Sequence, residues 1–262
     1  MAALQGGSFA ASAPPRLDRP WVRAALRRRN DGLSLFWRGR EQPKPRPELA
    51  GRRLLIVDAE DDFTGMLARL AESLGVTVRL RGWDAAGDLG GHDAVLIGPG
   101  PGDPCDLADR RIAALHATVR ELSATRTPLL AVCLGHQILA GELGLAVTRM
   151  GEPAQGVRRT ISLGGRPERV GFYHSYVALS AADEVHAPLL DAPVRVLRDR
   201  RTGAVHALST PRLRSVQFHV ESLLTEHGSA ILAEMLISVL DRRHDPRISD
   251  WHPRAGARRH VP

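Results

Sequence analysis

The stretch that best defines the fold is Leu129-Leu-Ala-Val-Cys-Leu-Gly-His-Gln137. Its apolar start indicates a buried strand, and the residues that follow favour a helix at about 135–143. Small residues stand on either side of the cysteine, at Ala131 and Gly135. A tight turn brings its flanking residues close together, so small side chains are needed there. The pattern therefore predicts a strand-turn-helix junction with Cys133 at its tip.

Strands and helices alternate on both sides of this junction. Apolar runs indicate strands at Leu54–Asp58, Val76–Leu80 and Ala94–Ile97, and helical spacing indicates helices at Phe63–Leu74 and Asp106–Leu122. Beyond residue 145 the pattern changes to short strands near 145–150, 157–163, 169–172, 194–198, 205–208 and 215–220, followed by a helix at 228–240. We expect an α/β fold with a central, mostly parallel mixed sheet, flanking helices and an added antiparallel portion.

The composition divides the chain into three parts. Residues 1–51 form a basic, Pro-rich extension, with a short amphipathic helix predicted at Trp21–Trp37 and a Pro-rich spacer at 41–47. Residues 52–241 carry the alternating pattern and form the expected domain. Residues 242–262 lack apolar periodicity and are predicted to be a disordered basic tail, as are the first 20 residues.

Charge and hydropathy exclude several classes of function. The net charge of +7 invites a nucleic-acid interpretation, but the positive charge is concentrated at the two ends of the chain. We therefore favour solvated ends over nucleic-acid binding. No apolar run is long enough to span a membrane, and the N-terminus lacks the features of a signal peptide, so a cytoplasmic protein with no membrane partner is expected. Two cysteines do not make a disulfide framework.

Cys133 is the candidate nucleophile. A helix that begins at a cysteine offers free N–H groups and the positive end of its dipole, which stabilise a thiolate and a developing oxyanion. The alternative is a buried structural cysteine at the end of a strand, and without its flanking sequence that alternative would be preferred. The surrounding stretch favours the nucleophile.

A second candidate pair lies in Ser215-Val-Gln-Phe-His-Val-Glu-Ser222. His219 and Glu221 are two positions apart on a predicted strand end, so their side chains can share one face. There, His219 would act as acid and base, and Glu221 would orient its ring. A histidine near a carboxylate is usually structural, so this pair gains meaning only from the cysteine elsewhere in the chain.

A third motif, Ile97-Gly-Pro-Gly-Pro-Gly-Asp-Pro104, follows a predicted strand. Its glycines let backbone N–H groups approach a ligand, and its prolines stiffen the loop. The loop is a candidate clamp for a substrate and its oxyanion, although taken alone a tight surface loop would be the better interpretation. A phosphate loop is excluded because the Lys-Ser/Thr ending is missing.

Together, in this order, the three motifs resemble the class I (triad-type) glutamine amidotransferases over about residues 52–240. The resemblance implies a flavodoxin-like fold and a triad of Cys133, His219 and Glu221. It also implies that the substrate L-glutamine contacts Gly100, Pro101, Gly102 and Gln137, and that the Leu134 N–H is a second oxyanion donor. No metal or other cofactor is implied for this chain.

The block Phe172-Tyr-His-Ser-Tyr176 resembles amidotransferases that serve chorismate-using enzymes. The run from Gln155 to Tyr173 looks most like the amidotransferase part of phenazine-type 2-amino-2-deoxyisochorismate synthases, and anthranilate synthase is the other similar enzyme. The block at 172–176 carries a further implication. It implies that Ser175 and Tyr176 contact glutamine through backbone groups. It also implies a chorismate-using synthase as partner, which would carry any Mg²⁺.

Two residues depart from the family pattern: Ala131 stands where many relatives have Gly, and Val220 where many have Pro. Both substitutions are compatible with the expected geometry, although Val220 could displace His219 slightly. The chorismate-using part is absent, so the chain is a fragment, a remnant or a subunit that stands alone. Two alternatives stay open: hydrolysis of γ-glutamyl peptides or amidation of another acceptor, and a non-catalytic regulatory subunit.

Overall fold

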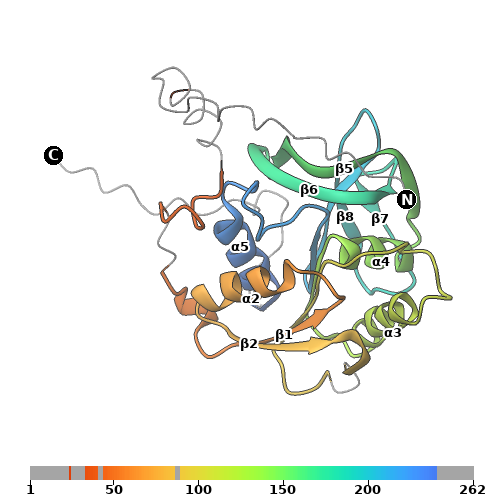
Figure 1. Cartoon of the computed structure of the whole chain (residues 1–262). Helices are drawn as coiled ribbons and strands as arrows, with labels where there is room; N and C mark the ends of the chain where they lie inside the picture. Colours follow the sequence, from red (N-terminus) through yellow and green to blue (C-terminus); the bar gives the residue numbers. More distant parts are fainter. Residues whose placement is uncertain (1–23, 25–32, 41–43, 86–88, 241–262) are drawn as a thin grey trace, which may run out of the picture. The chain divides into compact units, whose positions relative to one another are not determined.

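The computed structural model describes residues 24, 33–40, 44–85 and 89–240 (Figure 1). Residues 1–32 and 33–262 form separate units, and the fold concerns the second. Predictions for residues 1–20, for most of the helix at 21–37 and for the tail at 242–262 lie outside the described residues. Within the described part, no helix has the length and apolar character to cross a bilayer.

The centre of the fold is an eight-stranded sheet with the order β2-β1-β3-β4-β10-β9-β8-β7. The neighbours from β2 to β10 run parallel, and β9, β8 and β7 add antiparallel pairs. The strands are β1 (Arg53–Asp58), β2 (Thr77–Gly82), β3 (Ala94–Ile97), β4 (Leu129–Val132), β7 (Glu184–Val185), β8 (Val194–Arg198), β9 (Val205–Thr210) and β10 (Leu213–Val216). This mixed sheet confirms the predicted α/β fold.

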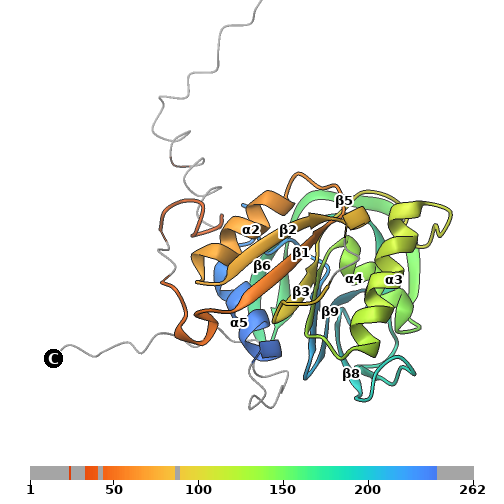
Figure 2. The same ribbon diagram turned by 90° about the horizontal axis from the view of Figure 1, so that it is seen from below.

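Helices cover both faces of this sheet (Figures 1 and 2). They are α2 (Thr64–Ser73), α3 (Arg110–Ala124), α4 (Leu134–Glu142) and α5 (Gly228–Leu240), with short 3₁₀ turns at Pro47–Leu49 and Trp83–Ala85. Alternate residues of β1 enter two separate apolar clusters: Leu54 and Ile56 pack with α2 and α5, and Leu55 and Val57 pack with α3 and α4. Burial on both faces explains the unbroken apolar run of this strand.

Two long strands form a second, antiparallel sheet, β5 (Ala146–Leu163) and β6 (Arg166–Leu179). The ribbon arches over the end of the central sheet where β4 leads into α4 (Figure 1). The register shifts between Arg149 and Ala154 and again between Gln155 and Val157. The predicted strands at 145–150 and 157–163 are therefore one irregular strand, and β6 extends well beyond the predicted 169–172.

Two of the boundaries that differ from the sequence-based expectations bear on the site or have a clear local cause. Helix α3 begins at Arg110 because the Asp109 side chain caps it, accepting from the N–H groups of Arg111 and Ile112. Strand β10 ends at Val216, so the expectation that His219 and Glu221 share a strand end was wrong. They lie in the turns that follow, where the His219 N–H donates to the Gly171 carbonyl of β6.

Ordered packing begins before residue 52. Leu49 is fully buried and belongs to the cluster under α2 and α5. Residues 33–40 form turns that lie against the segment after β10, with the Ser34 N–H donating to the Leu223 carbonyl. The division at residue 51/52 stays a prediction, but the described structure continues N-terminal to it.

Candidate active site

Cys133 occupies the junction between β4 and α4, as the local sequence predicts. It is the N-cap residue of α4 and has φ 53° and ψ −103°, a conformation that costs energy for a residue with a side chain. Its N–H donates to the Val216 carbonyl at 3.0 Å, which ties the turn to β10. A Cβ at Gly135 would come within 2.5 Å of the Ile97 carbonyl oxygen, so the turn requires glycine there.

His219 and Glu221 form a buried pair next to this junction. Nδ1 of His219 lies 2.6 Å from Oε1 of Glu221, and the two side chains are 1% and 0% exposed. With Nδ1 occupied, Nε2 is the nitrogen that remains for chemistry. Nε2 is buried and has no hydrogen-bond partner among the described residues.

Opposing effects set the pKa of His219. Burial alone lowers it, but the negative charges of Glu221 and Cys133 outweigh burial and hold the pKa well above its usual value. The sulfur is therefore close enough to the ring to act on its protonation. This arrangement favours a protonated imidazole next to Cys133, and a proton donor in that place is what a cysteine nucleophile needs.

Two aromatic rings enclose His219, and sequence reasoning assigned a role to neither. Phe63 packs edge-on to the imidazole with centroids 5.3 Å apart, and Tyr173 does so at 5.1 Å. The Tyr173 hydroxyl is 3.1 Å from the Ser222 hydroxyl. These contacts restrict rotation of the imidazole. Tyr173 lies inside the quoted block 172–176, whereas nothing in the local sequence marks Phe63.

The glycine loop lies against the cysteine junction. A Cβ at Gly100 would come within 2.7 Å of the Leu134 side chain, which shows how closely the two segments approach. The Pro101 carbonyl accepts from Arg111 at 3.0 Å, and Gly102 has φ 108°, a value suited to glycine. The N–H groups of Gly100, Gly102 and Leu134 donate to no acceptor among the described residues. These donors remain available to a ligand.

Gln137 points from α4 toward the ribbon. Its Nε2 donates to the Tyr176 carbonyl at 2.6 Å, and the same carbonyl lies 2.6 Å from Nδ1 of His174. Interaction with Asp103 of the glycine loop raises the pKa of the Tyr176 hydroxyl. Ser175 is half-buried, and its hydroxyl accepts from Gln155 at 3.4 Å. The structure thus places Gln137 and Tyr176 together, but the Tyr176 carbonyl already has two protein donors.

Gln217 is a further residue of this site that sequence reasoning missed. Its Nε2 lies 3.9 Å from the Cys133 sulfur, and its Oε1 accepts from Gln137 at 3.1 Å. The side chain is 1% exposed. Gln217 therefore links the candidate nucleophile to Gln137, and its place two residues before His219 was the available signal.

Comparison with known proteins identifies the family of this chain. The family model described as glutamine amidotransferase class-I matches residues 55–239. The chain belongs to the class I glutamine amidotransferase family. A phenazine-specific anthranilate synthase of Pseudomonas fluorescens is 43% identical over 84% of this chain, and anthranilate synthase component 2 of Mycobacterium tuberculosis is 34% identical over 70%. The chain covers 81% of the mycobacterial protein but only 34% of the Pseudomonas protein.

Solved structures share the fold of this amidotransferase domain. A putative GMP synthase subunit from Thermoplasma acidophilum has a TM-score of 0.56 at 20% identity, with 71% of this chain and 94% of that chain covered. A glutamine amidotransferase from Thermotoga maritima has a TM-score of 0.51 at 15% identity, with 73% and 97% covered. The fold is thus shared with these structures at low sequence identity.

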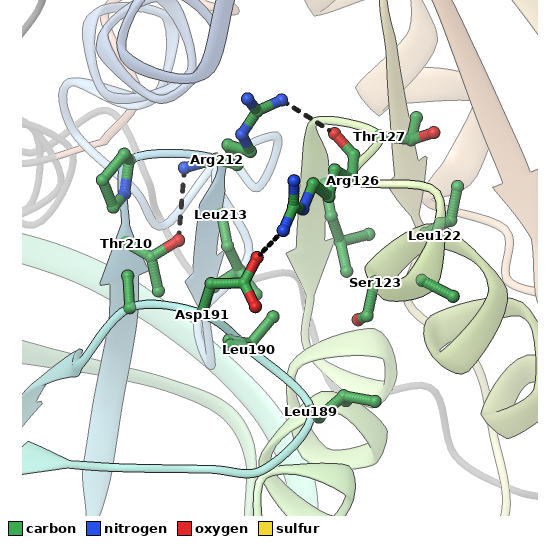
Figure 3. Close-up of a pocket in the computed structure, with 14 residues that line it drawn as sticks. Leu122, Ser123, Arg126, Thr127, Leu189, Leu190, Asp191, Thr210, Arg212 and Leu213 are labelled. Carbon is green, nitrogen blue, oxygen red and sulfur yellow. Dashed lines mark hydrogen bonds and ion pairs between the residues drawn. The ribbon is translucent and has the colours of Figure 1, made fainter.

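A cavity of about 600 Å³ lies elsewhere in the amidotransferase domain (Figure 3). It lies near Leu129, the first residue of β4, whereas Cys133 follows the last residue of that strand. The Arg126–Asp191 ion pair crosses it, and Arg212 donates to the Arg126 carbonyl at 3.1 Å. None of the predicted site residues lines it, so it is separate from the candidate active site.

Clustered metal ligands are absent from the described residues. There, no three or more His, Cys, Asp or Glu side chains gather in a way that could hold a metal ion. The absence of a cofactor requirement in this chain stays a prediction. The roles of Cys133, His219 and Glu221 likewise stay predictions.

Proposed function

We propose that this domain hydrolyses L-glutamine with Cys133, His219 and Glu221 and delivers the ammonia to a chorismate-aminating synthase. The buried His219–Glu221 pair at 2.6 Å, with Nε2 left for the cysteine, is the observation that carries the proposal. The pKa of His219, raised by the charges of Glu221 and Cys133 against the opposing effect of burial, supports it. Membership of the class I family supports the choice of glutamine as substrate.

In the first half-reaction, the Cys133 thiolate attacks the side-chain amide carbon of glutamine. The carbonyl oxygen becomes an oxyanion, and the N–H groups of Leu134 and of the loop at 100–102 are the donors that would stabilise it. His219 then gives its Nε2 proton to the amide nitrogen. The C–N bond breaks, ammonia leaves, and a γ-glutamyl thioester remains on the sulfur.

In the second half-reaction, neutral His219 takes a proton from water, which attacks the thioester carbonyl. The C–S bond breaks, glutamate leaves, and the imidazolium-thiolate pair is restored. Glu221 keeps the ring in the orientation that both proton transfers require. Metal chemistry has no step in this sequence, and any Mg²⁺ would act on the synthase side.

The names of similar proteins support the proposal of which synthase receives the ammonia. The Pseudomonas fluorescens protein is named as a phenazine-specific anthranilate synthase, and this chain corresponds to about a third of its length. We propose that this chain works with a synthase of the anthranilate or 2-amino-2-deoxyisochorismate type. That synthase is a separate subunit or another part of a longer protein.

A glutaminase assay on the full chain, alone and with such a synthase, tests the proposal. Cys133→Ala should abolish glutamate release, and Cys105→Ala is the matched control because Cys105 is exposed and outside the triad. Normal glutamate release by Cys133→Ala refutes the nucleophile. Parallel assays with γ-glutamyl peptides separate a glutaminase from a peptide hydrolase. No turnover even with the synthase would favour a non-catalytic subunit.

A further inference from the structure

Residues 33–40, here called the Trp37 segment, bind the backbone of the loop that carries Glu221. Nε1 of Trp37 donates to the Glu221 carbonyl at 2.6 Å. The N–H of Ser34 donates to the Leu223 carbonyl at 2.7 Å, and the N–H of Leu35 donates to the Glu226 carbonyl at 3.1 Å. Three hydrogen bonds from consecutive turns of one segment thus hold residues 221–226.

The Trp37 segment is anchored to the body of the domain. Phe36 packs against the apolar cluster under α2 and α5, and its ring meets the Trp37 ring edge-on with centroids 4.6 Å apart. Ser34 is 2% exposed. Apolar packing and hydrogen bonding together restrict the indole, so the Trp37 Nε1 has a defined position relative to the loop.

The carboxylate of Glu221 depends on this backbone for its placement. Its Oε1 bonds to His219, whereas its buried Oε2 has no hydrogen-bond partner in the part of the chain that the structure describes. A carboxylate held through one oxygen can rotate or shift if its backbone moves. Backbone contacts at residue 221 therefore control how well Glu221 meets the imidazole.

We propose that Trp37 is a positioning residue, which fixes the Glu221 backbone and thereby keeps the His219–Glu221 pair in its working geometry. This inference rests on the proposed glutaminase function. It gives the segment N-terminal to residue 52 a role in the site rather than that of a spacer.

The pH at which the His219 ring loses its proton is a suitable readout of the position of Glu221. Besides Glu221, the charged or titratable groups around the ring are Cys133 at the α4 junction, Asp61 before α2, and Tyr173 and His174 on β6. Removing the Trp37 hydrogen bond changes none of these groups directly. A shift in the pKa of His219 would therefore report movement of Glu221.

The test is Trp37→Phe in the full chain, which removes the N–H and keeps an aromatic ring. We expect kcat for glutamine hydrolysis to fall about threefold to tenfold, the equivalent of one hydrogen bond, with KM unchanged. The upper limb of the pH profile should move to lower pH. Trp83→Phe is the matched control: Trp83 donates its N–H to Oε1 of Glu60 at 2.9 Å, and Glu60 keeps its ion pair with Arg111 through the other oxygen.

A double-mutant cycle separates positioning from general loss of structure. If Trp37 acts through Glu221, then Trp37→Phe should have no further effect on kcat in a Glu221→Gln background. Equal losses in both backgrounds, or an unchanged kcat and pH profile in Trp37→Phe, would overturn the inference. Thermal unfolding of each variant shows whether a loss reflects an unfolded fraction.

The inference and the proposed function fail in different ways. Glutamine hydrolysis by wild type but not by Cys133→Ala supports the function, and Trp37→Phe then tests the inference alone. If wild type has no turnover, the function fails, but the positioning role is still measurable. An NMR titration of the His219 ring in wild type and Trp37→Phe should show a lower pKa in the variant, and identical titrations would refute the role of Trp37.

Discussion

The His219 ring nitrogen Nδ1 and the Glu221 oxygen Oε1 are 2.6 Å apart in a region from which water is excluded. The low dielectric surrounding them strengthens their attraction. Because the Glu221 carboxylate has no other hydrogen-bond partner among the described residues, its charge acts mainly on this one ring. The protonation of His219 is therefore the property of the site that should respond most directly to substitution.

Replacing Glu221 with Gln should lower the pH at which the imidazolium loses its proton. Burial lowers the pKa of His219, and the negative charge of Glu221 is the largest effect that opposes burial. The upper limb of kcat/KM against pH should shift to lower pH, and activity near neutral pH should fall on the order of 10²–10⁴-fold. Steady-state kinetics from about pH 5 to 10, roughly the range in which imidazoles and thiols titrate, measure the shift of the upper limb and the loss of activity. An unshifted upper limb would mean that Glu221 does not act on His219.

Gln217 should contribute to turnover although it is outside the predicted triad. Gln217→Leu removes the donor to the Cys133 sulfur and the acceptor for Gln137. Two hydrogen bonds of roughly 1 kcal/mol each correspond to a loss in kcat/KM of about 30-fold. Gln217→Glu should be worse, because it places a negative charge beside the thiolate and keeps only the acceptor. If both variants lose activity only in proportion to their thermal stability, Gln217 is a packing residue.

The sequence predicted the parts of the fold that depend on local pattern. The β4–α4 junction combines an apolar run with small residues at 131 and 135, and the structure places Cys133 there with positive φ. The β5–β6 sheet was harder to predict from the sequence, because Gly151 and Pro153 break the apolar alternation inside β5. Its two halves therefore suggested two strands, and pairing with β6 across register shifts joins them.

The sequence predicted the site less completely, because several contacts join distant residues. Trp37 and Glu221 are separated by 184 positions, and nothing near either residue signals their hydrogen bond. The spacing of His219 and Glu221 suggested a shared strand face, whereas a turn after β10 brings them together. The motif predicted the two residues, but it could not predict that their backbone bonds to β6 and to the Trp37 segment.

The close approach of α4 to β3 makes Gly135 critical for stability. Gly135→Ala would place a Cβ 2.5 Å from the Ile97 carbonyl, so backbone must move, which costs about 1–3 kcal/mol. Gly141 in the same helix is the control, since its nearest neighbour to an added Cβ is 3.9 Å away. Gly141→Ala should be neutral or stabilising by up to about 1 kcal/mol. Denaturant unfolding compares the two, and equal stabilities would contradict the tight junction.

Buried histidines should make the domain sensitive to acid. Burial, and then the charges of His206 and His174, lowers the pKa of His136 to about 3. Burial is also the main cause that lowers the pKa of His206 to about 4, helped by His174 and Arg159. Unfolding restores values near 6.5, so the unfolded chain binds more protons in acid. The stability that these neutral rings contribute is complete above pH 6.5 and is lost as the pH falls toward these folded-state values.

His206→Gln removes one of these proton-binding groups and should make the decline of the melting temperature between pH 7 and about 4.5 shallower. His206 is only half-buried, so the domain should tolerate the uncharged side chain. His186→Gln is the control, because His186 is exposed and its substitution should leave the slope unchanged. A decline that is equally steep in wild type and His206→Gln would show that protonation at this position does not destabilise the fold.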